Sequence, residues 1–359
     1  MAGVASRGPD AGFWAGRKVL LTGHTGFKGS WAALWLHRMG ARVTGLALAP
    51  ESPALFDLAR VGDVVESHLV DLRDQAAVEA TVRAAAPEIV LHMAAQPIVR
   101  RSLADPVETF ATNVLGTVHL LDTLRRVEGL RAVLVITSDK VYANAEAGHA
   151  FAESDPLGGK DPYSASKAAC EIATSSMARS FLGPAGVRVA TARGGNVVGG
   201  GDFAADRLVP DAVRALVAGR PLVLRHPEAT RPWQHVLDCI AGYLVFAEDL
   251  VAGREVPPSL NFGPLPGADV TVGRLAEAVL AALGDTKGYV HEPVPGSVEM
   301  KTLAIDSRLA RRLLAWRDRI TGDLLTDFTA EWYRAWIAGQ DMHDTTLAQI
   351  RRFEALASS

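Results

Sequence analysis

The chain has 359 residues, of which 48% are hydrophobic, 21% charged and 6% aromatic, a composition typical of a soluble α/β protein. Intrinsic disorder is excluded for most of the chain, and at about 150 residues per domain the length suggests two lobes or one large domain. The formal charge of −3, with 37 Lys and Arg against 40 Asp and Glu and no dense basic run, removes the electrostatic basis for nucleic-acid binding.

The N-terminal part of the chain predicts alternating strands and helices. Residues 1–15 are small and polar with Gly and Pro, and we expect them to form a disordered lead-in. The apolar run at 18–22, which ends in glycines, predicts a buried strand. Trp31, Leu34, Trp35 and Leu36 recur at helical spacing, so we expect a helix that ends near Gly40 and a second strand at 42–48.

The same alternation continues to about residue 195. We expect strands at 65–70, 89–92, 132–137 and 188–192, and helices at 75–86, 107–127 and 163–180. Continuous Val, Ile and Leu runs separated by helices predict an α/β fold, a Rossmann-like doubly wound parallel sheet with a smaller, partly interleaved C-terminal substrate-binding lobe. We assign 16–195 to the dinucleotide-binding domain, to which 235–263 returns, and 196–234 with 264–359 to the second lobe.

A glycine-rich turn follows the first predicted strand. Glycines at such a turn let the backbone approach a pyrophosphate, whose charge then lies at a helix N-terminus. Alone the motif is weak, but after the first strand of this series it predicts cofactor contacts from Gly23, Thr25, Gly26, Phe27, Lys28 and Gly29. The end of the second strand offers neither an acid for a ribose nor an arginine for a 2′-phosphate, which favours NAD over NADP only by default.

Asp71 and Leu72 follow the third predicted strand. This position would suit contact with an adenine edge. An N-cap role for Asp71 before the next helix is an equally good interpretation.

Two further motifs provide acid and base chemistry. Tyr163 and Lys167 are one helical turn apart, so the ammonium can lower the phenol pKa and reach a ribose hydroxyl. Ser138, Asp139 and Lys140 follow the strand before that helix, where ligands bind in open α/β sheets. The alternatives are a solvated Tyr-Lys pair and a Ser-Asp turn cap.

The segment after residue 193 suggests a second anion site. Asn196 lies among glycines, and Arg207 and Arg231 follow, which could hold a diphosphate through bidentate hydrogen bonds, although each arginine singly is more often a surface residue. Histidines such as His24, His92 and His226 lack metal-ligand spacing, and Cys170 and Cys239 are far apart, so we expect neither bound metal nor a disulfide, and a cytoplasmic protein. No apolar run has the length of a membrane span.

Together these motifs resemble the extended short-chain dehydrogenases/reductases, and within them the CDP-glucose 4,6-dehydratase branch. The resemblance extends from about Phe13 to Trp332 and is dense at 23–31, 94–100, 113–117, 138–142, 155–164, 194–210 and 231–236. It implies a tightly held NAD that is reduced and reoxidised within one turnover. It also implies loss of water from CDP-glucose to give a 4-keto-6-deoxy sugar nucleotide.

The resemblance implies roles for single residues. Tyr163, activated by Lys167, would take the proton of the sugar 4-hydroxyl, Ser138 would bind the C4 oxygen and Asp139 would protonate the departing C6 hydroxyl. Lys140 occupies the position of a glutamate base in related dehydratases, and it would either remove the C5 proton or stabilise the enolate. Further cofactor contacts are implied for Ala94, Ala95, Gln96 and Asn113, and substrate contacts for Gln96, Ser138, Asn196, Arg207, Leu208, Arg231 and His235.

Two alternatives stay open. A sugar-nucleotide epimerase or decarboxylase would share the glycine turn with Tyr163 and Lys167 but has no need of an acid such as Asp139. A non-catalytic NAD-binding regulator would be expected to lose Tyr163 or Lys167. The resemblance also implies a homodimer or dimer of dimers, formed through the long helices at 107–127 and 163–180.

Overall fold

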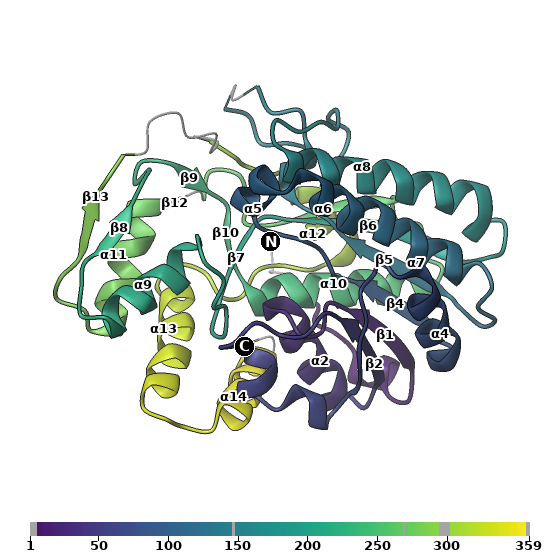
Figure 1. Cartoon of the computed structure of the whole chain (residues 1–359), viewed down its shortest axis with the longest axis horizontal. Coiled ribbons are helices and arrows are strands. Elements are labelled where there is room, and N and C mark those ends of the chain that lie inside the picture. The colour runs from purple at the N-terminus through teal and green to yellow at the C-terminus, as the bar shows by residue number, and fades with distance from the viewer. Residues whose placement is uncertain (1–5, 146–147, 269, 294–301, 357–359) are drawn as a thin grey trace, which may run out of the picture.

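A seven-stranded, entirely parallel sheet forms the centre of the molecule in the computed structural model, which describes residues 6–145, 148–268, 270–293 and 302–356 (Figure 1). The strand order is β11-β6-β5-β4-β1-β2-β3. The strands are β1 (Lys18–Thr22), β2 (Arg42–Ala47), β3 (Glu66–Leu69), β4 (Ile89–His92), β5 (Ala132–Ile136), β6 (Arg188–Gly194) and β11 (Ser259–Phe262). The predicted α/β fold with a Rossmann-like sheet is confirmed, and its direction of winding reverses between β1 and β4, where such sheets bind ligands.

Helices cover both faces of this sheet. Those of the first half are α1 (Ala11–Trp14), α2 (Phe27–Arg38), α3 (Leu55–Leu58), α4 (Gln75–Ala85), α5 (Val99–Ala104), α6 (Pro106–Phe110), α7 (Gly116–Leu124) and α8 (Pro162–Met177). Single turns of π-helix continue α6 into α7 at Ala111–Leu115 and extend α8 at Ala178–Leu182, and short 3₁₀ helices lie at Val61–Asp63 and Asp139–Val141.

Successive residues of one strand point to opposite cores. Leu21 packs in the core formed with α2 and α10 (Val236–Val251), whereas Leu20 packs in the core formed with α4 and α7. Both side chains are fully buried. This two-sided burial explains why the strands contain continuous apolar runs rather than alternating patterns.

The second lobe joins short strand pairs to helices and lies to the left in Figure 1. Its strand pairs are β7 (Asn196–Val198) with β10 (Trp233–His235), β9 (Thr230–Arg231) with β12 (Val270–Thr271), and β8 (Leu222–Leu224) with β13 (Tyr289–His291). Apart from α10, the helices of the C-terminal half are α9 (Leu208–Val217), α11 (Val272–Leu283), α12 (Arg308–Leu314), α13 (Asp323–Ile337) and α14 (Met342–Ala355).

The two lobes exchange segments. The structure places α10 and β11 on the seven-stranded sheet, with β11 paired to β6. The last helix, α14, also contacts α2, where Trp35 donates a hydrogen bond to Glu354 at 3.0 Å and its ring meets Phe353 edge-on. The expectation that all of 264–359 belongs to the substrate lobe therefore differs from the structure at this helix.

The N-terminal segment is folded rather than disordered. Trp14 is fully buried and donates a hydrogen bond from Nε1 to Glu248 of α10 at 2.8 Å. Arg7 forms ion pairs with Glu248 at 2.8 Å and with Asp249 at 2.6 Å. The predicted disordered lead-in at 1–15 is thus wrong for residues 6–15, because one tryptophan and one arginine anchor this polar segment to a buried helix; residues 1–5 lie outside the described residues.

None of the helices in the described ranges combines the length and the apolar character that crossing a membrane requires.

Candidate active site

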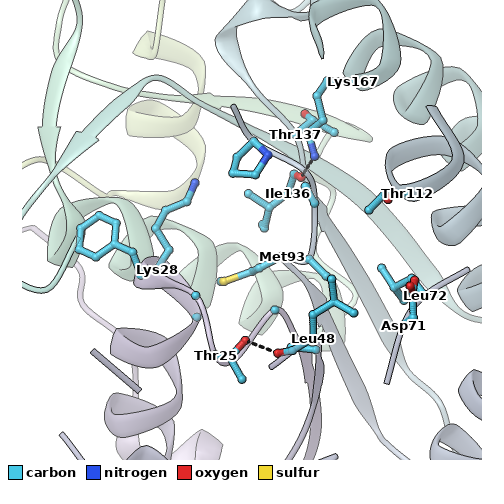
Figure 2. Close-up of a pocket in the computed structure, with 18 of the residues that line it drawn as sticks. Thr25, Lys28, Leu48, Asp71, Leu72, Met93, Thr112, Ile136, Thr137 and Lys167 are labelled. Atoms are coloured by element: carbon cyan, nitrogen blue, oxygen red, sulfur yellow. Dashed lines mark hydrogen bonds between the residues drawn. The ribbon is translucent and has the colours of Figure 1, made fainter. Parts of the chain in front are cut away.

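A cleft with an empty volume of about 1010 Å³ opens at the carboxyl ends of the central strands (Figure 2). Predicted site residues that line it are Gly23, Thr25, Gly26, Phe27, Lys28, Gly29, Asp71, Leu72, Ala94, Ala95, Tyr163, Lys167 and Arg207. The structure therefore brings together residues from five separate parts of the sequence.

The glycine turn lies closely against its neighbours. Gly23 has a φ of +78°, and a Cβ there would lie 2.7 Å from the backbone nitrogen of Ala94. A Cβ at Gly29 would lie 2.0 Å from the carbonyl oxygen of Gly23. Gly26 caps α2 with no side-chain hydrogen bond, which leaves first-turn amides available to an anion. These residues fit the pyrophosphate of a dinucleotide.

The adenosine end of the cleft is bounded by Leu48 and Asp71. Thr25 donates a hydrogen bond to the carbonyl oxygen of Leu48 at 2.9 Å, which holds the turn against the end of β2. Asp71 accepts hydrogen bonds from Arg73, and these hold the pKa of its carboxyl below its ordinary value. Asp74, not Asp71, caps α4 by accepting from Ala77, so the alternative N-cap role for Asp71 is wrong.

Tyr163 and Lys167 both lie in the cleft wall, but they are not paired as predicted. The Lys167 ammonium donates to the carbonyl oxygen of Ile136 at 2.8 Å, and burial lowers its pKa. Burial raises the pKa of the Tyr163 phenol to about 12, and the nearby Ser138 hydroxyl offsets only part of this rise. The expected lowering of the phenol pKa by Lys167 is therefore not found, because burial dominates and the ammonium bonds to backbone instead.

The segment after β5 places three polar residues beside Tyr163. Ser138 is buried; its hydroxyl donates to Asp139 Oδ1 at 3.1 Å and accepts from the backbone nitrogen of Lys140 at 3.2 Å. Asp139 is 2% exposed, and its Oδ2 has no hydrogen-bond partner within the described chain. Lys140 is half-buried. A hydroxyl and a carboxyl group with a free oxygen thus lie together, and Lys140 follows them in the chain; none of the three is among the residues that line the cleft.

Gln96 and Asn113, which were predicted to contact the cofactor, form hydrogen bonds within the protein instead. The backbone nitrogen of Gln96 donates to Asn113 Oδ1 at 2.8 Å, and Asn113 Nδ2 donates to Ser166 Oγ at 2.9 Å. The side-chain amide of Gln96 bonds to Thr109 at 2.9 Å. Both residues are buried behind the cleft, whose wall is formed there by Pro97 and by Thr112.

Of the residues predicted to bind substrate, Arg207 lines the cleft, whereas Leu208, Asn196 and Arg231 do not. Arg207 forms an ion pair with Asp202 at 2.9 Å, and Leu208 follows it at the start of α9. Asn196 lies in β7, and Arg231, in β9, is buried and donates to the carbonyl oxygen of Thr230 at 2.8 Å.

His235 does not reach the cleft. It is fully buried, its Nδ1 caps α10 by accepting from Leu237, and its ring meets Phe328 edge-on. Burial lowers its pKa to about 3. The prediction that it contacts substrate is corrected because packing between α10 and α13 turns its ring into the core.

Several cleft residues were not predicted from the sequence. Val70, Met93 and Thr137 line the cleft, and each directly follows one of the central strands. Their positions were the available signal, since the carboxyl ends of parallel strands meet at one edge. Within the described ranges, His, Cys, Asp and Glu side chains form no group of three or more that could hold a metal ion.

Comparison with known proteins agrees with this geometry. The model of the NAD dependent epimerase/dehydratase family matches residues 19–263. The chain is 43% identical over 340 residues to CDP-glucose 4,6-dehydratase of Salmonella typhimurium, covering 93% of this chain and 95% of that protein. UDP-glucose 4-epimerase of Thermus thermophilus, solved with NAD, superposes with a TM-score of 0.76 at 26% identity, covering 88% of this chain and 98% of that one. dTDP-glucose 4,6-dehydratase of Bacillus anthracis has the same fold, with a TM-score of 0.74 at 21% identity over 90% and 99% of the two chains.

Proposed function

The chain belongs to the NAD-dependent epimerase/dehydratase family, and from this membership and its cleft we propose that it is a CDP-glucose 4,6-dehydratase. This hydro-lyase converts CDP-D-glucose into CDP-4-dehydro-6-deoxy-D-glucose and water. The base and sugar are those named for the Salmonella relative, with which the chain shares 43% of its residues over nearly its whole length.

The choice of dehydration over epimerisation rests on the position of Asp139. Elimination of water from C5 and C6 needs an acid for the departing hydroxyl, whereas a change of configuration at C4 does not. Asp139 is buried, accepts a hydrogen bond from Ser138 at 3.1 Å, and keeps one oxygen without a hydrogen-bond partner within the described chain. A carboxyl group in this place can protonate a leaving group, so dehydration is favoured over epimerisation.

The glycine turn and Lys167 would hold the cofactor. The turn from Gly23 to Gly29 fits the pyrophosphate, Asp71 lies at the adenosine end, and Lys167 reaches the part of the cleft nearest Tyr163. Bound NAD would accept a hydride from sugar C4 and return it to C6.

The remaining roles are assigned to this chain's own side chains. With NAD bound, the positive charges of the nicotinamide ring and of Lys167 would favour the phenolate of Tyr163, which takes the proton of the 4-hydroxyl while Ser138 donates to the C4 oxygen. The resulting ketone acidifies the C5 proton, which the neutral amine of Lys140 removes while the carboxylic acid of Asp139 protonates the C6 hydroxyl as it leaves. C5 regains a proton from the Lys140 ammonium when the hydride returns to C6. Arg207, whose side chain faces the same cleft, binds the substrate diphosphate.

The proposed reaction is tested by incubating the protein with CDP-glucose, and separately with the dTDP, UDP and GDP sugars, in deuterated water. We expect product from CDP-glucose that has lost one water, has deuterium at C5 and leaves no net reduced NAD. An unchanged mass would identify an epimerase, and accumulation of reduced NAD would identify an oxidase.

The assembly we propose is a homodimer through α5, α6 and α8, which lie side by side in Figure 1. Val107 is 77% exposed and Ile172 is 61% exposed, and exposed side chains of Leu103, Leu115 and Phe181 lie on the same group of helices. Exposed apolar residues at this density commonly mark an interface. The free cysteines Cys170 and Cys239 and the nucleotide-sugar chemistry support our further proposal of a cytoplasmic location.

A further inference from the structure

A buried ion pair lies behind the Ser138 to Lys140 segment. Glu171 is on α8, one helical turn beyond Lys167, and Arg193 is on β6. Arg193 Nη2 lies 2.9 Å from Glu171 Oε2, and Arg193 Nε donates to Glu171 Oε1 at 3.0 Å. Both side chains are 5% exposed, so the pair is bidentate and shielded from water.

This ion pair is bonded to both ends of the segment. Thr137, which directly precedes Ser138, donates from Oγ1 to Glu171 Oε1 at 2.5 Å. Tyr142, which follows the short 3₁₀ helix, accepts from Arg193 Nη1 at 2.9 Å. Thr191 adds a hydrogen bond to Glu171 at 2.8 Å, so every oxygen of this carboxylate is held.

We propose that Glu171 and Arg193 are positioning residues that hold Ser138, Asp139 and Lys140 in register with Tyr163 and Lys167. The inference rests on the proposed function, in which one group of residues serves oxidation at C4 and another serves the elimination of water. Tyr163 and Lys167 are placed by α8 itself. Asp139 and Lys140, which serve the elimination, lie on a separate segment. The ion pair of Glu171 and Arg193 joins that segment to α8.

A role in stability alone would not require this arrangement. Burial of two charges is costly, and well-packed apolar residues of the same volume often stabilise a fold as well or better. What an ion pair bonded to Thr137, Tyr142 and Thr191 adds is a fixed geometry of the segment. Misplacement of a reacting group by about 1 Å can reduce a rate by about 100-fold.

The inference predicts that oxidation and elimination can be separated. Without the Glu171 charge, Tyr163 and Lys167 stay in place, so sugar C4 is still oxidised and KM changes little. Loss of water from C6 slows by about 100-fold because Asp139 and Lys140 shift relative to the sugar. Reduced nicotinamide then accumulates transiently on the enzyme.

The test is a single-turnover experiment on the full chain loaded with NAD and mixed with CDP-glucose. The variant is Glu171→Gln, which keeps the side-chain shape. The matched control is Glu248→Gln, because Glu248 is also a buried acid, 3% exposed and paired with an arginine, but it contacts Arg7 and Trp14 away from the cleft. Near-ultraviolet absorbance follows the reduced nicotinamide, and deuterium at C5 follows elimination.

We expect transient absorbance and slow water loss for Glu171→Gln, and wild-type kinetics for Glu248→Gln. Equal ratios of oxidation to elimination in the two variants would overturn the inference. If Glu171→Gln does not fold, Thr137→Val decides, since it removes the hydroxyl that bonds to Glu171 and, at 3.5 Å, to the carbonyl oxygen of Ala192, and it should shift the same ratio. A wild type that dehydrates no nucleotide-glucose would overturn the proposed function as well, whereas an active wild type with unchanged variants would overturn the inference alone.

Discussion

Lys167 donates a hydrogen bond from its ammonium to the carbonyl oxygen of Ile136 at 2.8 Å, which joins the middle of α8 to the last residue of β5 (Figure 2). Figure 2 also shows Lys28 reaching into the cleft from the start of α2. Two ammonium groups thus face one cleft in a chain whose formal charge is −3. Anionic ligands can be bound by a few local groups without a basic surface.

Tyr163 is expected to be indispensable for turnover. Replacing it with Phe removes the hydroxyl that accepts the sugar proton, and we expect kcat to fall by about 10² to 10⁴. Steady-state measurement of the 4-keto product checks this. Tyr289→Phe is the matched control, because Tyr289 lies in β13 of the second lobe, and it should keep full activity. A Tyr163→Phe enzyme within a few-fold of wild type would refute the assignment.

Lys140 is expected to exchange the C5 proton. In Lys140→Met, we expect reduced nicotinamide to form while deuterium incorporation at C5 is lost, since oxidation at C4 does not use the amine. Lys287→Met, which changes an exposed lysine of the second lobe, serves as control. If Lys140→Met incorporates deuterium at the wild-type rate, the base is another group and Lys140 has at most a role in stabilising the enolate.

The predicted motifs that line the cleft depend on short-range geometry. The Gly23 to Gly29 turn and the Tyr163 and Lys167 pair each lie within one loop or one helix, so spacing along the chain determines which residues are neighbours. The positions of the strands and their parallel sheet also followed from apolar runs that alternate with helices. For these features the sequence contains the needed information locally.

The positions that were misjudged depend on long-range packing. Whether His235 faces the cleft or the core is decided by its contact with Phe328, which is far along the chain. Asn113 braces Ser166 rather than lining the cleft, and Trp14 folds the N-terminal segment through Glu248. No pattern around these residues indicates their partners, because the partners come from other elements.

Gly29 and Gly26 are expected to differ when each is replaced by Ala. A Cβ at Gly29 would meet the Gly23 carbonyl oxygen at 2.0 Å, so Gly29→Ala should distort the turn and lower the thermal midpoint. At Gly26 the nearest atom is 3.4 Å away, an ordinary contact, so Gly26→Ala should keep the midpoint and weaken NAD binding only. Thermal unfolding and NAD titration of both variants measure the difference; equal midpoints would contradict it.

The apolar face of α6 and α8 is expected to hold the dimer. Val107→Glu or Ile172→Glu introduces a charge at side chains that are 77% and 61% exposed in the single chain, and burial of an unpaired charge at an interface is unfavourable. We expect monomers by analytical ultracentrifugation. Val217→Glu on α9, at a side chain 63% exposed outside this face, is the control and should leave the assembly unchanged. A monomeric wild type would refute the proposed dimer.

His235 is expected to make the protein sensitive to acid. Its pKa is lowered by burial to about 3, below the value of about 6.5 in an unfolded chain, so the folded state favours the neutral ring. This contribution to stability is complete above about pH 6.5 and is lost as the pH falls from there toward about 3. Between about pH 7.5 and about pH 5 the loss amounts to about 2 kcal/mol in the free energy of unfolding.

Comparison with His235→Asn isolates this single group. Asparagine can still cap α10 but does not titrate, and every other ionisable group is common to the two proteins. Urea unfolding at both pH values should therefore show the wild type losing about 2 kcal/mol more than the variant. If the free energy of unfolding fell equally in the two proteins, the His235 ring would already be protonated, or exposed to water, in the folded state.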